Sequence, residues 1–249
     1  MNELFKRNYN LRYFEMNKHG MASPVTILTL LEETAAEHCL NIGYSLYDLE
    51  KQNIGWVLTS GVIEMLRYPK YKENITVLTW LSKYTLVRGY RENLILDEDK
   101  NIIGKAKGRW VFYDIQKRKP VPIFDDIIKK WKFNMESAIE ENPELINQGG
   151  EGDLKNEFCI YRSDIDSYKH VSNIRYLHFL LESLPEDFLD KYYLKTINAK
   201  FFSEAKFGDK IQVYIDDNLG NNNFLHTMKN DADNKKFARA YTQWENIAS

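Results

Sequence analysis

Two stretches of the chain carry apolar side chains at the three- and four-residue spacing of a helix. The first stretch follows Ser23 and holds Ile27, Leu28, Leu31, Ala35 and Cys39. The second follows Asn173 and holds Ile174, Leu177, Leu181 and Leu184. Residues at this spacing share one face of a helix. Further apolar residues lie around both circumferences, which is typical of a helix enclosed by other elements. We predict two buried helices.

Polar residues mark the expected start of each helix. Ser23 and Asn173 are of the types that accept a hydrogen bond from the free N–H groups of a first helical turn. Pro24 stands at the first helical position, where no donor is needed. We therefore expect Ser23 and Asn173 to be the two N-cap residues.

Each helix is followed by several segments that are apolar or that alternate between apolar and polar residues. In the first half we expect strands at 55–67, 75–85, 87–96 and 103–115, and in the second at 194–202, 210–215, 223–229 and 237–245. The turn-rich segments DEDKN and DADNK precede the last strand of each set. Such composition favours antiparallel hairpins.

The order of features repeats along the chain at an offset of 150 residues. Arg12 then matches Arg162 and Ser23 matches Asn173. Each half has an extended segment, a polar turn, a helix and strands, so we predict an α+β protein. We expect a tandem double hotdog, each half a long central helix wrapped by an antiparallel sheet. We expect domains at 1–133 and 157–249, joined by a polar linker at 134–156.

Composition excludes several classes of function. The 249 residues are 43% hydrophobic and 28% charged with a net charge of −2, which fits a globular protein and not a general nucleic-acid binder. No segment has the length of a signal peptide or a membrane span, so a cytoplasmic protein is expected. Cys39 and Cys159 are expected to be buried free thiols. No Gly-rich phosphate loop or clustered histidine set indicates a cofactor or a metal.

The segment from Asp164 to Tyr176 reads DIDSYKHVSNIRY. It resembles the signature Asp-x-Asp-x-Asn-x-His-Val-x-Asn-x-x-Tyr of the acyl-acyl carrier protein thioesterases, the plant FatA and FatB group and its bacterial relatives. The matching residues are Asp164, Asp166, His170, Val171, Asn173 and Tyr176. The second element of that family, a Glu followed by Cys or another small residue, is matched by Glu204 and Ala205. The resemblance extends over nearly the whole chain.

The resemblance implies a thioester hydrolase that releases free fatty acid from acyl carrier protein (ACP) in fatty acid biosynthesis. Two departures bear on its chemistry. Tyr168 stands where the family has a catalytic asparagine, and Ala205 offers no nucleophile. A covalent route through a thiol is therefore closed to this chain, whereas a route in which a carboxylate activates water stays open.

The catalytic candidates are Asp166, His170 and Glu204. Glu204 would act as the general base for the attacking water. His170 would orient or polarise the water or the carbonyl, and Asp166 would hold the imidazole in one tautomer. The helix beginning near Asn173 would direct its free N–H groups at the developing oxyanion. Tyr168 and Asn173 are candidate substrate-binding residues.

The first half has no such set of polar residues. At the offset of 150, Met16 matches Asp166 and Gly20 matches His170, and alignment of the strands places Tyr68 near the position equivalent to Glu204. We expect this half to be a scaffold that holds the acyl chain. The candidates to line that pocket are Trp56, Met65 and Trp110, with Leu66 and Trp80, although any of them can equally be a core residue.

The expected partner is an ACP that carries a fatty acyl chain. ACPs are acidic, and a basic rim near the site would attract one. The rim candidates are Lys169, Arg175, Lys195, Lys200, Lys206 and Lys210. Two alternatives stay open: an acyl-CoA thioesterase of the same fold, and a non-catalytic acyl-binding module. A homodimer is also compatible with the sequence.

Overall fold

The computed structural model describes residues 4–131, 133–134, 136–140, 146–147, 149–166 and 170–247. The chain divides into two compact units, Met1–Glu140 and Glu141–Ser249. Within the described residues no helix is both long enough and apolar enough to cross a lipid bilayer.

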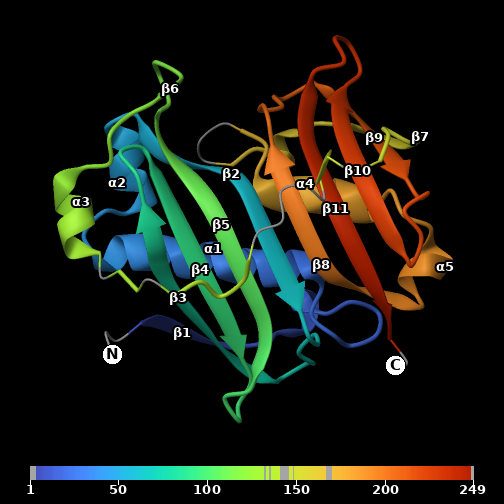
Figure 1. Ribbon diagram of the computed structural model, residues 1–249, viewed down its shortest axis with the longest axis horizontal. Helices are drawn as coiled ribbons and strands as arrows, with labels where there is room; N and C mark the ends of the chain where they lie inside the picture. Colours follow the sequence, from blue (N-terminus) through green and yellow to red (C-terminus); the bar gives the residue numbers. More distant parts are fainter. Residues whose placement is uncertain are drawn as a thin grey trace. The chain divides into compact units, whose positions relative to one another are not determined.

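The first unit is an antiparallel sheet that holds one long helix (Figure 1). Its strand order is β1-β3-β4-β5-β2, and β6 pairs with β5. The strands are β1 (Phe5–Asn10), β2 (Ile54–Met65), β3 (Asn74–Tyr84), β4 (Arg88–Leu96), β5 (Ile102–Asp114) and β6 (Lys119–Pro120). The helices are α1 (Pro24–Asn41), α2 (Leu46–Lys51) and α3 (Asp125–Lys130), and a 3-10 turn spans Tyr13–Glu15.

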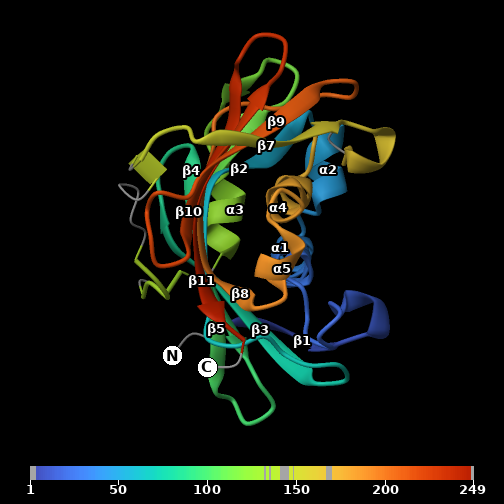
Figure 2. The same ribbon diagram turned by 90° about the vertical axis from the view of Figure 1, so that its right-hand side faces the viewer.

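The second unit repeats this arrangement with a shorter helix. Its strand order is β8-β11-β10-β9-β7, and Figure 2 shows α4 and α5 on one face of this sheet. The strands are β7 (Asp153–Cys159), β8 (Tyr192–Phe201), β9 (Lys210–Asp216), β10 (Asn223–Asn230) and β11 (Lys236–Asn246). The helices are α4 (Asn173–Leu181) and α5 (Glu186–Leu189), and a 3-10 turn spans Arg162–Asp164.

The predicted fold class is confirmed: each unit has the sheet and central helix of a hotdog, and the chain is α+β. The eight predicted strands all occur, with ends within two residues of the expected ones. The structure adds the edge strands β1 and β7. Four residues of the predicted linker, 153–156, belong to β7, and the boundary between the two compact units falls at 140/141.

The repeat has an offset of 149 residues at the helix starts, not 150. The N-cap of α1 is Ser23, whose hydroxyl accepts a hydrogen bond from the Thr26 N–H at 3.0 Å. The N-cap of α4 is Ser172, and Asn173 is the first helical residue, so the predicted cap at Asn173 is wrong. The 3-10 turns at Tyr13–Glu15 and Arg162–Asp164 obey the same offset of 149. The identity of a few residues at 150 misled the sequence alignment.

The buried faces of the two helices agree in part with the expected ones, since Ile27, Leu31, Cys39, Leu177 and Leu184 are buried. In α1 the polar side chains of Thr34 and His38 are buried beside Ile27 and Leu31. In α4 the buried residues are Tyr176, Leu177, Phe179 and Leu180. Ile174 and Leu181, which the spacing predicted to be buried, are half-buried.

The two cysteines are free, as expected, but only Cys39 is buried. Burial raises the pKa of the Cys39 thiol. Cys159 is exposed, because it ends the edge strand β7, which carries alternating exposed side chains. The prediction of burial is therefore wrong for Cys159.

Candidate active site

The imidazole of His170 and the carboxylate of Glu204 lie in contact, with Nε2 and Oε2 3.2 Å apart. His170 stands in the loop before α4 and Glu204 in the loop after β8. Their side chains retain 27% and 24% of their exposure, so the pair is partly enclosed but can be reached by solvent. A base and a polarising group within reach of the same water is what thioester hydrolysis requires.

A tight turn presents His170 to this site. The Asp166 N–H donates to the His170 carbonyl at 2.8 Å, and the His170 N–H donates to Asp166 Oδ1 at 3.2 Å. Ile165 and Val171 form an antiparallel bridge that closes the turn. The carboxylate of Asp166 therefore contacts the backbone of His170, and its predicted influence on the imidazole tautomer stays a prediction.

The first unit contains the same turn. There the Asn17 N–H donates to the Met21 carbonyl at 2.7 Å, and the Met21 N–H donates to Asn17 Oδ1 at 3.2 Å. Asp166 therefore corresponds to Asn17, and His170 to Met21, not to Met16 and Gly20 as the sequence alignment proposed. Because an amide oxygen closes the turn in one unit and a carboxylate oxygen in the other, this backbone contact does not require a charge.

The loop that carries Glu204 is also repeated. The N–H groups of Phe202 and Ser203 both donate to the Phe237 carbonyl, at 2.9 and 3.4 Å. In the first unit those of Leu66 and Arg67 both donate to the Ile103 carbonyl, at 2.8 and 3.4 Å. Counting onward from these bonds, Glu204 corresponds to Tyr68, which agrees with the alignment of the strands made from the sequence.

A tyrosine fixes the Glu204 loop to helix α4. The Ala205 N–H donates to the hydroxyl oxygen of Tyr176 at 3.0 Å. Tyr176 is 4% exposed, and burial raises the pKa of its hydroxyl, which therefore stays protonated. Sequence reasoning noted Tyr176 as a match to the motif but gave it no role. The signal that could have revealed this role is that Tyr176 lies in the first turn of the helix that follows the His170 motif.

The start of α4 is anchored by an ion pair with a buried carboxylate. Arg175 forms a salt bridge with Asp164, whose carboxylate also accepts the Tyr161 N–H at 2.8 Å. Within the described residues the N–H groups of Asn173 and Ile174 have no acceptor. First-turn N–H groups of a helix stabilise negative charge, so this helix end suits an oxyanion.

Two domain models match this chain. The N-terminal domain of acyl-ACP thioesterases matches residues 2–131, and the C-terminal domain matches residues 149–246. The chain belongs to the acyl-ACP thioesterase family. Membership in this family identifies it as a thioester hydrolase.

The curated relatives within this family come from plants. The chain is 24% identical to oleoyl-acyl carrier protein thioesterase 2, chloroplastic, of Arabidopsis thaliana, with 98% of the chain and 77% of the relative covered. It is 24% identical to palmitoyl-acyl carrier protein thioesterase, chloroplastic, of Gossypium hirsutum, with 97% and 63% covered. The chain thus spans about two thirds to three quarters of their length.

Solved structures of acyl-ACP thioesterases share the fold. The acyl-ACP thioesterase from Bacteroides thetaiotaomicron superposes with a TM-score of 0.86 at 22% identity, covering 96% of this chain and 97% of that one. The 12:0-ACP thioesterase from Umbellularia californica superposes with a TM-score of 0.82 at 16% identity, covering 98% and 97%.

The remaining residues that the sequence assigned to this thioesterase site lie in different surroundings. Tyr168 falls in 167–169, outside the described residues. Trp56 packs against Phe112 with ring centroids 4.7 Å apart, and Met65 is fully buried. Trp110 pairs with Leu58 in the β2–β5 ladder. These are contacts of sheet and core residues, and a place for them in an acyl pocket of the thioesterase stays a prediction.

Some residues of the predicted basic rim of the thioesterase are paired with carboxylates and others are exposed. Arg175 and Lys195 are each paired with a carboxylate, Asp164 and Glu245. Lys200 lies over the ring of Phe202 at 5.2 Å and, like Lys206, is exposed. Lys169 lies outside the described residues. No group of three His, Cys, Asp or Glu side chains within the described ranges is arranged to hold a metal ion.

Proposed function

We propose that this chain hydrolyses the thioester of a fatty acyl-ACP by activating a water molecule at Glu204. The observation that carries the proposal is the 3.2 Å separation of His170 Nε2 and Glu204 Oε2, which joins two motif elements 34 residues apart in the sequence. Family membership supports the reaction, and this contact supports the residues that perform it.

Glu204 acts as the general base. Its carboxylate takes a proton from water while the water oxygen attacks the thioester carbonyl carbon, forming a tetrahedral intermediate with an oxyanion. His170, in contact with Glu204, orients the water or polarises the carbonyl. The intermediate then collapses and the C–S bond breaks. The leaving thiolate takes the proton that Glu204 had accepted from the water, which restores the Glu204 carboxylate as the fatty acid leaves. General acid–base catalysis of this kind contributes about 10²- to 10⁴-fold.

The N-terminus of α4 supplies the oxyanion site. The N–H groups of Asn173 and Ile174 have no acceptor within the described residues, and each good donor to an oxyanion is worth about 3 kcal/mol. Asp166 and Tyr176 act indirectly, by positioning other residues. Asp166 closes the turn that holds His170, and Tyr176 holds the loop that carries Glu204. Ala205 has no nucleophilic atom, so no acyl-enzyme forms at that position.

The direct test is release of free thiol from acyl-ACPs of several chain lengths, with the matching acyl-CoA esters assayed in parallel. We expect hydrolysis, and we expect Glu204→Gln to lower kcat at least about 100-fold. Glu182→Gln, which neutralises an exposed glutamate at the end of α4, is the matched control and should leave kcat unchanged. Glu204→Gln with kcat within about tenfold of the unaltered chain removes Glu204 from the role of base.

The same assay decides between the carriers. Faster turnover of the CoA esters would favour the acyl-CoA thioesterase alternative, and no thiol release from either carrier would favour a non-catalytic acyl-binding module. Because ACPs are acidic, exposed cations near Glu204 would favour the ACP substrate. Lys200 and Lys206 are exposed and flank the segment with Glu204.

Charge reversal tests the ACP surface. The double change Lys200→Glu and Lys206→Glu is expected to raise KM for acyl-ACP about fivefold or more at low salt and to leave KM for acyl-CoA within about twofold. Lys191→Glu, at the opposite end of β8, is the control. An unchanged KM for acyl-ACP in the double variant contradicts a role for this surface in binding ACP.

A further inference from the structure

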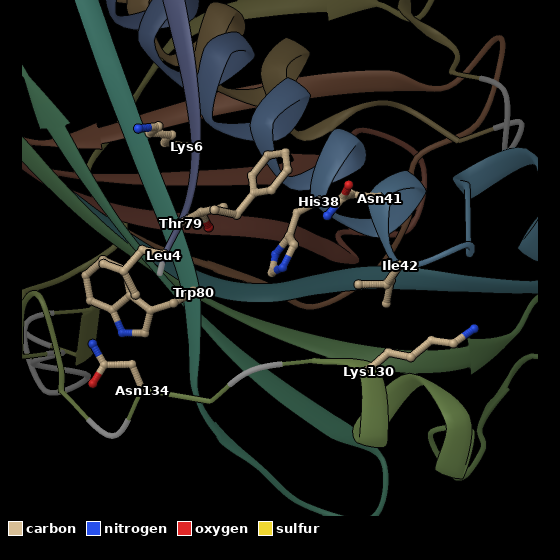
Figure 3. Close-up of a pocket in the computed structure, with 10 residues that line it drawn as sticks. Leu4, Lys6, His38, Asn41, Ile42, Thr79, Trp80, Lys130 and Asn134 are labelled. Carbon is tan, nitrogen blue, oxygen red and sulfur yellow. The ribbon is translucent and has the colours of Figure 1, made fainter. Parts of the chain in front are cut away.

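The first unit contains a pocket of about 330 Å³ at the C-terminal end of α1 (Figure 3). It is bordered by β1, β3, α3 and the end of α1, and its described lining residues include none with an acidic side chain. One part of the wall is apolar, formed by Leu4, Phe5, Ile42 and Trp80. The volume is at the lower end of the range of small-molecule sites.

Behind this pocket lies a buried arginine without a carboxylate partner. Arg91 of β4 is 6% exposed, and its guanidinium Nη1 contacts His38 Nδ1 at 3.0 Å and Thr79 Oγ1 at 3.1 Å. No acidic side chain pairs with it among the described residues. Burial lowers the pKa of the Arg91 guanidinium, but an arginine stays charged in proteins. A buried charge of this kind normally has a counter-ion.

The contact with Arg91 fixes the tautomer of His38. A guanidinium nitrogen can only donate a hydrogen bond, so His38 Nδ1 must accept, and the ring proton is on Nε2. Burial and the neighbouring Arg91 charge lower the pKa of His38 to about 3, so the ring stays neutral. Phe5 stacks on it at 4.9 Å, which holds its orientation.

His38 Nε2–H is therefore a fixed donor that faces the pocket. His38 is 8% exposed, and within the described residues its Nε2 has no hydrogen-bond partner. Figure 3 shows the ring pointing from α1 into the space framed by Trp80 and Lys130. Because Nε2–H faces the pocket, a ligand oxygen there would accept it in place of solvent.

Taken together, these groups specify a ligand with two parts. The positive charge of Arg91 and the ammonium groups of Lys6 and Lys130 at the rim favour an anion. Lys130 is already paired with Asp126 at 2.9 Å, so the uncompensated charge is that of Arg91. The apolar wall favours a ligand with an aliphatic or aromatic body. A small amphipathic carboxylate has both parts.

We propose that this pocket binds a small amphipathic carboxylate, with one carboxylate oxygen accepting the His38 Nε2–H and the apolar body lying against Trp80 and Ile42. Such a site is separate from hydrolysis at Glu204, and its occupation can be measured without any thioester.

The indole N–H of Trp80 reports on this site, because Trp80 lines the pocket. We would titrate the full chain with hexanoate, hexan-1-ol and inorganic phosphate and follow the indole signals by ¹H–¹⁵N NMR, assigning Trp80 from Trp80→Phe. Hexanoate should shift the Trp80 signal saturably and the Trp244 signal little. Glu204→Ala should give the same titration, which separates this site from the catalytic one. An equal response to hexan-1-ol or to phosphate overturns the proposal.

Variants at His38 supply the second criterion. His38→Phe removes the donor and should weaken hexanoate binding at least tenfold. His38→Gln keeps an oxygen that can accept from Arg91 and an N–H that can face the pocket, and should bind within threefold of the unaltered chain. His19→Phe, at an exposed histidine, is the control. Hexanoate binding by His38→Phe at unaltered affinity contradicts the assignment. If that variant does not fold, the comparison of hexanoate with hexan-1-ol on the unaltered chain decides.

Discussion

The hydroxyl of Tyr176 accepts the backbone N–H of Ala205 at 3.0 Å, and the corresponding residues of the first unit cannot form this bond. At the repeat offsets, Tyr176 corresponds to Ile27 and Ala205 to Pro69. Ile27 has no hydroxyl to accept the bond, and Pro69 has no backbone N–H to donate it. The bond therefore occurs only in the unit that contains His170 and Glu204. Its place beside Glu204 suits a role in positioning the proposed base.

Tyr176→Phe tests this positioning role. The ring keeps its packing, while the Ala205 N–H loses its acceptor, which costs about 1–2 kcal/mol of unfolding free energy. We expect kcat to fall about tenfold, with KM changed less than about twofold, because the base moves while the substrate surface does not. Tyr193→Phe, which removes a hydroxyl bonded to Glu245 at 2.6 Å in the same unit, should leave kcat unchanged. An unaltered kcat in a folded Tyr176→Phe chain contradicts the role.

Asp166 is expected to act through its contact with the His170 backbone. Asp166→Asn retains an oxygen for the His170 N–H, as Asn17 does for Met21, and should change the unfolding free energy by less than about 0.5 kcal/mol. Asp166→Ala removes the acceptor and should cost about 1 kcal/mol and lower kcat further. Thiol release and urea denaturation measure the two effects. If Asp166→Asn loses as much kcat as Asp166→Ala, the charge is needed and the imidazole tautomer becomes the better explanation.

Gly208 closes the loop that carries Glu204 in a left-handed conformation, with φ of +86°. Its N–H donates to the Ile160 carbonyl at 3.1 Å, and a Cβ added there would meet no atom within 4 Å. Gly208→Ala should therefore cost about 1–2 kcal/mol of unfolding free energy through backbone strain alone. The control is Lys72→Ala at the corresponding position, where φ is already +66° with a Cβ present and a smaller change is expected. Equal losses in both variants, measured by urea denaturation, would exclude strain as the cause.

His226 makes stability depend on pH. Burial lowers its pKa to about 3 in the folded chain, whereas the unfolded chain binds the proton below about pH 6.5. Protonation thus favours unfolding, and this contribution to stability is complete above pH 6.5 and is lost as the pH falls toward 3. His226→Gln, which keeps a group that can bond Thr242, should reduce the slope of unfolding free energy between pH 5 and 6 by about 1 kcal/mol per pH unit. Urea denaturation at several pH values measures the slope. The same slope in both chains would show that His226 is not buried as a neutral ring.

Much of this fold could be predicted because its periodicities are strong. Alternating strands and the turns at 97–101 and 231–235 marked the ladders within two residues. The register of the repeat was less certain, because Asn173 and Ser172 are both good cap types and sequence alone ranks them equally. The error of one residue then placed His170 opposite Gly20 instead of Met21.

The pairing of His170 with Glu204 came from the motif resemblance, and no local pattern would have predicted it, because the two loops are joined only by the folded sheet and α4. The polar interior of the first unit was missed for a related reason. His38 lies on a face that periodicity marks as core, and Arg91 lies in the middle of a strand. Their contact depends on tertiary packing between α1 and β4, which a hydropathy pattern does not contain.

Pro69 also limits how the first unit could be re-engineered. Grafting a copy of the proposed His–Glu pair onto it would need Met21→His and Tyr68→Glu for the reactive groups. Those two changes alone would leave the grafted carboxylate on a segment with no tether to the helix, so Ile27→Tyr and Pro69→Ala would have to accompany them. A second working centre in this unit would thus require four positions to be changed together.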